Sequence, residues 1–190
     1  MNNNNENINT LRNLTAENHA RAENTMFMRL AMASAISEEE YMDYITQLSV
    51  IYTALEFAAQ KFGILQEFPG ISRLNNIRAD VAELNAKLGR QSHIVWATNS
   101  YYNRIVEMTD KDTVLAHFYV RYAADLYGGQ MLKNLPYGSR QLYEFGDNLP
   151  FLRQKMREIA TPNLADQANM AFDSNIRILN EVMGITGDLF

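Results

Sequence analysis

Residues 117–130 read His117-Phe-Tyr-Val-Arg-Tyr-Ala-Ala-Asp-Leu-Tyr-Gly-Gly-Gln130, a helical pattern that ends in two adjacent glycines. His117, Arg121 and Asp125 lie four residues apart, so they form one polar stripe along a helix that is otherwise apolar and aromatic. Each glycine destabilises a helix by about 1 kcal/mol relative to alanine. The pair either lets a kinked backbone approach a flat ligand, because no Cβ intrudes, or ends the helix as a cap. The stretch alone leaves both interpretations open.

Helical periodicity extends outward from this stretch in both directions. Apolar residues recur at three- and four-residue spacing, and alternating strand-like runs are scarce. Ser37 and Glu40 form a capping box that predicts the start of a long helix reaching about Lys61. We expect an all-α fold, a single compact multi-helix domain over residues 10–190, preceded by a flexible asparagine-rich tail over residues 1–9. Further helices are expected over residues 10–24, 27–35, 73–88, 99–108, 140–145, 150–159 and 162–182. Another is expected over residues 113–134, with Asp112 as its cap and an internal interruption at Gly128-Gly129.

The composition excludes several classes of protein. The 190 residues include no cysteine, which excludes disulfides, thiolate metal sites and cysteine nucleophiles. No apolar stretch approaches the roughly 20 residues that span a bilayer, and the first nine residues lack the apolar core of a secretory signal. The net charge of −5 argues against nucleic acid as the main partner. We expect a cytoplasmic protein that contacts neither membrane nor nucleic acid.

His19 is the candidate metal ligand. Glu23 follows it by four residues and Arg12 precedes it by seven, so all three share one helical face. A neutral imidazole can bind iron through one nitrogen while a carboxylate orients the other. Arg12 could then pair with a carboxylate of the ligand. From spacing alone, a solvated His–Glu pair without a metal is the simpler explanation.

Two long motifs resemble the haem (heme) oxygenase family. The stretch from His117 to Gln130 resembles the family's distal-helix motif, usually H-x-Y-x-R-Y-L-G-D-L-S-G-G-Q. Glu17-Asn-His-Ala-Arg-Ala-Glu-Asn-Thr-Met-Phe-Met-Arg29 resembles its proximal segment, V-H-x-x-A-E-N-x-x-F-M. The resemblance covers about residues 10 to 185. Shorter matches in the family's order are Ile51-Tyr-Thr-Ala-Leu-Glu56, Phe151-Leu-Arg-Gln-Lys-Met156 and Ala171-Phe-Asp-Ser-Asn-Ile176.

The resemblance implies a haem sandwiched between a proximal helix and a kinked distal helix. His19 would be the axial ligand of the haem iron, with Glu23 as its partner. Asp125 would organise a water network for proton delivery. Its implied partners in catalysis are Arg121, Tyr52, Tyr102 and Asn175. The remaining haem-binding residues that it implies are Gly128 and Gly129 against the porphyrin, Arg12, Tyr119 and Arg153 near the propionates, and Phe172.

The reaction that the resemblance implies consumes haem, O2 and electrons, and yields biliverdin, by default the IX-alpha isomer, with CO and Fe2+. No flavin or iron–sulfur motif is present, so the electrons must come from an external donor such as ferredoxin, flavodoxin or a reductase. Arg153, Lys155 and Arg157 either dock an acidic donor or form a solvated helix face. A monomer is the family default.

Three positions depart from the family's pattern. Ala124 stands where the family usually has glycine, so its methyl group could crowd the distal pocket. Leu149 and Ala16 replace basic positions, which makes the regiospecificity of ring opening less secure. Ala124 motivates an alternative, a haem-binding or storage protein with weak or no turnover. Thiaminase-like and di-iron relatives are disfavoured, because the chain has no cysteine and no Glu-x-x-His pair.

Overall fold

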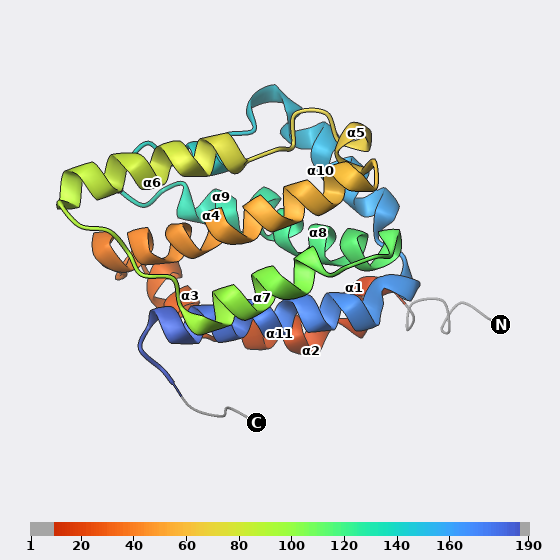
Figure 1. The fold of residues 1–190 in the computed structure, drawn as a ribbon, viewed down its shortest axis with the longest axis horizontal. Coiled ribbons are helices and arrows are strands. Elements are labelled where there is room, and N and C mark those ends of the chain that lie inside the picture. Colours follow the sequence, from red (N-terminus) through yellow and green to blue (C-terminus); the bar gives the residue numbers. More distant parts are fainter. Residues whose placement is uncertain (1–9, 187–190) are drawn as a thin grey trace.

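The computed structural model describes residues 10–186, which form an all-α fold without strands, as predicted (Figure 1). The expected tail over residues 1–9 lies outside this range. None of the helices described is long and apolar enough to cross a membrane. The α-helices are α1 (Leu11–Leu14), α2 (Ala16–Glu23), α3 (Met26–Met32), α4 (Glu38–Lys61), α5 (Ile64–Glu67), α6 (Leu74–Leu88), α7 (Trp96–Val106), α8 (Lys111–Leu126), α9 (Gly129–Leu132), α10 (Leu149–Ile159) and α11 (Ala165–Val182). Short 3-10 helices are η1 (Gln141–Tyr143), η2 (Gly146–Asn148) and η3 (Pro162–Leu164).

The long helix α4 lies at the centre of the core. It begins at the predicted capping box, in which Ser37 Oγ accepts the Glu40 N–H at 3.1 Å and Glu40 Oε2 accepts the Ser37 N–H at 2.8 Å. The helices α6, α7 and α8 pack against it, so most of its residues are buried. A buried helix of this kind can present polar side chains to the interior, where they must find partners.

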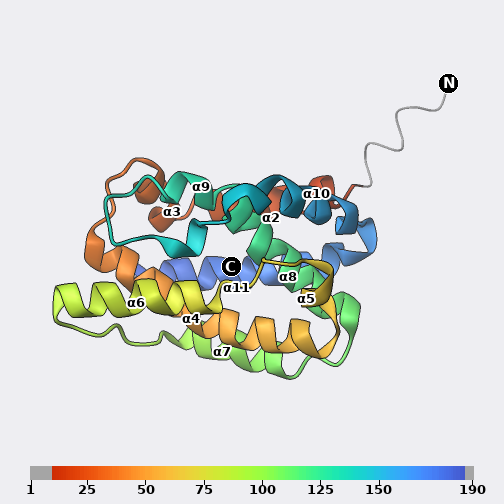
Figure 2. The ribbon, with the colours of Figure 1, turned by 90° about the horizontal axis from the view of Figure 1, so that it is seen from above.

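The helices α8 and α11 lie between two outer groups. Figure 2 shows α4, α6 and α7 along one side of the molecule and α2, α9 and α10 along the other. α11 packs against both α8 and α2. Its contact with α8 includes Ala116, Ala168 and Ala171, whose small side chains let the two helices approach closely. This packing connects the helix that carries His19 with the helix that carries Asp125.

Several predicted boundaries were wrong for local reasons. The first helix is interrupted at Thr15, whose hydroxyl donates to the Leu11 carbonyl at 2.9 Å beside its own backbone N–H at 3.0 Å, a pattern that bends helices. The cap of α8 is Asp110, not Asp112, because Asp110 Oδ2 accepts the Thr113 N–H at 2.7 Å. The predicted interruption of the distal helix at Gly128-Gly129 is confirmed, since α8 ends at Leu126 and α9 begins at Gly129, but the helical residues then end at Leu132 rather than at residue 134.

Candidate functional site

The break after α8 is stabilised by side chains from elsewhere in the fold. Tyr127, the residue that follows the last helical one, has φ −112° and ψ −74°, well away from regular helical values. The carbonyls that lose their helical partners receive other donors. Gln130 Nε2 donates to the Asp125 carbonyl at 3.2 Å, and Arg153 donates through Nε and Nη2 to the Leu126 carbonyl at 2.9 and 2.7 Å. The chain therefore bends without leaving these carbonyls unsatisfied.

The two glycines at this break have different surroundings. Neither has a positive φ, so left-handed capping does not explain the pair. Gly129 is buried, and a Cβ there would lie 2.7 Å from ring carbons of Tyr143. Gly128 is exposed, and so is Ala124 one turn earlier. Gly129 thus makes room for Tyr143, while Gly128 leaves open backbone on the outer face of the bend.

Asp125 is the centre of a buried polar network. Its carboxylate accepts Arg121 Nη2 at 2.9 Å on one oxygen and the Tyr52 hydroxyl on the other. Arg121 Nη1 also donates to Asn175 Oδ1 at 3.5 Å. Burial raises the pKa of Asp125, and the charge of Arg121 opposes that shift. Four of the five residues predicted to be catalytic therefore meet in the interior, from α4, α8 and α11.

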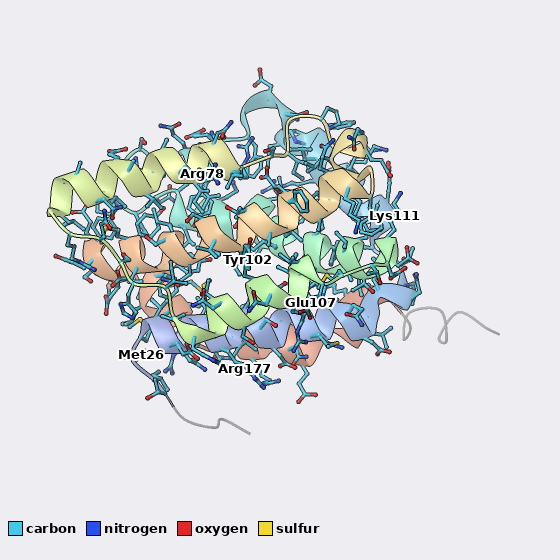
Figure 3. All side chains as sticks on the ribbon, viewed as in Figure 1. Met26, Arg78, Tyr102, Glu107, Lys111 and Arg177 are labelled. Carbon is cyan, nitrogen blue, oxygen red and sulfur yellow. The ribbon has the colours of Figure 1, made fainter. Side chains whose placement is uncertain are left out.

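The fifth residue, Tyr102, lies apart from this network. It is half-buried on α7 and makes no hydrogen bond within residues 10–186 (Figure 3). The neighbouring Tyr101 is fully buried, and its hydroxyl lies 2.7 Å from His117 Nδ1. His117, the first member of the polar stripe, is therefore engaged with α7.

Sequence reasoning missed two tyrosines beside the network. Burial raises the pKa of Tyr44, and Arg121 partly offsets this shift. Tyr44 precedes Tyr52 by two helical turns on the same face of α4, a spacing that could have identified it. Tyr143 is buried next to Gly129 and acts electrostatically on Arg121. It comes from a 3-10 turn, where no helical spacing relates it to α8.

His19 lies on α2 with its imidazole open to solvent. Its side chain is 58% exposed, and Nδ1 lies 3.5 Å from Glu23 Oε2. The ring contacts Phe172 of α11 edge to face, with centroids 5.7 Å apart. Phe172 also packs against a cluster that contains Val120 of α8. Among the described residues no three His, Asp or Glu side chains could hold a metal ion together, so iron at His19 would need most of its ligands from another molecule.

Positive charge gathers along one edge of α8. Burial and Tyr127 raise the pKa of Tyr119, and Arg12 of α1 lowers it, which places that arginine near α8. The Arg153 guanidinium lies over the Tyr127 ring, 5.1 Å from its centroid. These side chains could pair with carboxylates of a ligand. Leu149 packs against the core and Ala16 is exposed, so neither adds charge to this edge.

Comparison with known proteins gives one consistent result. The family model described as "Heme oxygenase" matches residues 6–181. The chain is 30% identical to heme oxygenase 1 of Synechocystis sp. PCC 6803, across 92% of this chain and 83% of that protein, and 28% identical to heme oxygenase 1 of Nostoc sp. PCC 7120, across 93% and 85%. The crystal structure of the Synechocystis heme oxygenase-1 in complex with heme superposes with a TM-score of 0.77 at 28% identity, covering 92% of this chain and 90% of that one. The heme oxygenase of Leptospira interrogans shares the fold, with a TM-score of 0.78 at 24% identity over 90% and 97% of the two chains.

Proposed function

The chain belongs to the haem oxygenase family, and from this premise we propose that it binds haem and cleaves it oxidatively to biliverdin, CO and Fe2+. O2 is the co-substrate, and an external donor such as ferredoxin, flavodoxin or a reductase supplies the electrons. By family default the product is the IX-alpha isomer, and the protein acts as a cytoplasmic monomer. The observation that carries the proposal is the buried Asp125 carboxylate, held by Arg121 and Tyr52 just before the break in α8.

Haem would bind between α2 and the outer face of α8. His19 would bind the iron, because its imidazole is exposed on α2 while Glu23 lies close enough to orient the ring. Phe172 supports that imidazole from α11. Gly128 lets the opposite face of the macrocycle approach backbone, since a Cβ there would occupy the outer face of the bend. Arg12 and Arg153 would pair with the propionates.

Haem supplies the redox chemistry when bound, and the chain supplies orientation and protons. Asp125 can hold a proton at neutral pH more readily than an exposed aspartate, because burial raises its pKa. Tyr52 and Arg121 fix the direction of its carboxylate oxygens. Arg121 Nε is buried and has no hydrogen-bond partner in the described chain, which leaves a donor for an ordered water. These groups would deliver protons through water rather than by direct contact.

Reconstitution with haemin tests the proposal. We expect stoichiometric binding, followed by loss of the haem spectrum and appearance of bilin and CO when ascorbate or reduced ferredoxin is added in air. His19→Ala should lose the axial-imidazole spectrum, whereas His93→Ala should keep it, since His93 is exposed and separate from the site. Haem that stays intact under reduction would contradict turnover, and an unchanged spectrum in His19→Ala would contradict the assigned ligand.

A storage protein is the second candidate, and Ala124 favours it. The methyl group of Ala124 is exposed one turn before Gly128, on the face of α8 that haem would contact. If wild type binds haem without degrading it while Ala124→Gly degrades it, storage is the function. If wild type already produces bilin at a rate that Ala124→Gly does not improve, this candidate is excluded.

A further inference from the structure

A small cavity lies between α7 and α11. Its volume is about 120 Å³, and its lining includes Trp96, Arg104, Met170, Asp173 and Arg177. Figure 1 shows α7 and α11 side by side, and Figure 3 labels Arg177 on this face. Figure 2 places α7 on the side of the molecule away from α9 and α10. The cavity is therefore distinct from the open face of α8 described above.

Two guanidinium groups line the cavity without forming an ion pair in the described residues. Arg104 and Arg177 make neither a hydrogen bond nor an ion pair within the described part of the chain. Two of the carboxylates nearby are already engaged. Asp173 pairs with Arg21 at 3.0 Å, and Glu181 accepts the Ala97 N–H at 2.9 Å. Two like charges beside one cavity repel each other, so an anion that bridges them would be stabilising.

The cavity also presents apolar surface. Trp96 is 68% exposed and Met170 is 39% exposed, and both line the cavity. A ligand bound there could therefore cover them. Indole and thioether groups pack well against a flat ring. The cavity is much smaller than the roughly 300–1,000 Å³ of pockets for drug-sized ligands. The lining is mostly polar, with apolar surface from Trp96 and Met170, so the cavity suits at most one small ring that carries a carboxylate.

We propose that the α7/α11 cavity binds a small aromatic carboxylate, with the carboxylate on Arg104 and Arg177 and the ring on Trp96. This binding does not depend on haem, because no haem-binding residue proposed above lines the cavity. It adds a second ligand site to a chain whose family relationship explains only the first.

Trp96 makes the test specific, because it is the chain's only tryptophan. The protein without haem is titrated with sodium benzoate while Trp96 fluorescence is recorded at constant ionic strength. We expect a saturable change. Neutral benzamide, of the same shape, should bind at least about tenfold more weakly, because it cannot pair with the arginines. Inorganic phosphate, which has charge but no ring, should also bind more weakly than benzoate.

The double variant Arg104→Gln/Arg177→Gln should weaken benzoate binding at least about tenfold and reduce its salt dependence. Arg157→Gln is the matched control, because it removes an exposed positive charge on α10. Unchanged circular dichroism and melting would show that both variants fold. A linear, unsaturable fluorescence change, equal binding of benzamide or phosphate, or wild-type affinity in the double variant would each overturn the proposal.

Discussion

Asp125 is a carboxylate that the fold has almost completely removed from water. It is 1% exposed, and its two oxygens accept hydrogen bonds from Arg121 and Tyr52. Removing one partner from a buried ion pair leaves the other charge uncompensated, which costs about 3–5 kcal/mol. Asp125 therefore contributes both to the proposed proton delivery and to the unfolding free energy, so a variant must be tested for both.

We expect Asp125→Asn to lower the rate of bilin formation at least about tenfold, because the amide cannot carry the proton. Haem affinity should change little, since Asp125 does not lie on the exposed face. The unfolding free energy should fall by about 3 kcal/mol, because Arg121 loses its counterion. Single-turnover absorbance and urea denaturation measure the two effects. Asp112→Asn, an exposed carboxylate on the same helix, is the control. Wild-type turnover in Asp125→Asn would contradict the proposed role.

His117 predicts a pH dependence of stability. Burial lowers its pKa from 6.5 to about 4, so the folded state binds this proton less tightly than the unfolded chain does. The contribution of neutral His117 to the unfolding free energy is fully present above pH 6.5. It is lost as the pH falls toward about 4. Between about pH 7 and about pH 4.5 this group should remove about 2–3 kcal/mol of unfolding free energy.

His117→Gln should make that loss smaller by a similar amount, because glutamine does not titrate and its carbonyl can still accept the Tyr101 hydroxyl. Urea denaturation at the two pH values measures the difference. If wild type and His117→Gln lose stability in parallel, the histidine is not the titrating group.

The break between α8 and α9 depends on side chains that lie outside α8. A helix end needs donors for its last carbonyls, and here Gln130 and Arg153 supply them. The turn then brings Gly129 against Tyr143 and leaves Gly128 open. The two adjacent glycines therefore have different roles. Gly129 makes room for a buried ring, and Gly128 leaves the outer face of the bend open.

Alanine at each glycine should give opposite results. Gly129→Ala places a methyl group 2.7 Å from the Tyr143 ring, so we expect a loss of about 1–3 kcal/mol in unfolding free energy. Gly128→Ala meets only the Ala124 carbonyl at 3.4 Å, so stability should change by less than about 1 kcal/mol. Haem titration should instead show weaker binding for Gly128→Ala. The reverse order in urea denaturation would contradict this division.

Glu56 links three segments that lie far apart in the sequence. Its Oε1 accepts the backbone N–H of Arg73 at 2.6 Å, that of Leu74 at 2.9 Å and the Tyr122 hydroxyl at 2.8 Å. It therefore holds α4 against the start of α6 and against α8.

Glu56→Ala should lower the unfolding free energy by about 3 kcal/mol or more, because two backbone donors lose their partner. Tyr122→Phe removes one hydrogen bond and should lose only about 1 kcal/mol. Equal losses in urea denaturation would contradict this assignment.

Local patterns in the sequence predicted much of the fold. Periodicity and the Ser37 capping box predicted α4, α6 and α11 because these features depend on neighbouring residues. Thr15 and Asp110 were missed because single side-chain hydrogen bonds, which periodicity does not reveal, decided the helix boundaries there. Spacing related Arg121 to Asp125, but only the resemblance brought Tyr52 and Asn175 together with them, because those residues lie far away in the sequence. Tyr143 and the α7/α11 cavity were not predictable, because they depend on contacts between segments distant in sequence.

Arg153 has hydrogen-bond donors both for the protein backbone and for a haem propionate. Two of its nitrogens already hold the Leu126 carbonyl, so only the outer Nη1 is fully open to an incoming propionate. A carboxylate seated there would restrain the same side chain that closes α8. Haem binding should then slow amide hydrogen exchange around residues 127–131. Mass spectrometry can measure this change without relying on the haem spectrum. The exchange rate of the amides at the end of α8 would thus show whether haem is bound beside them.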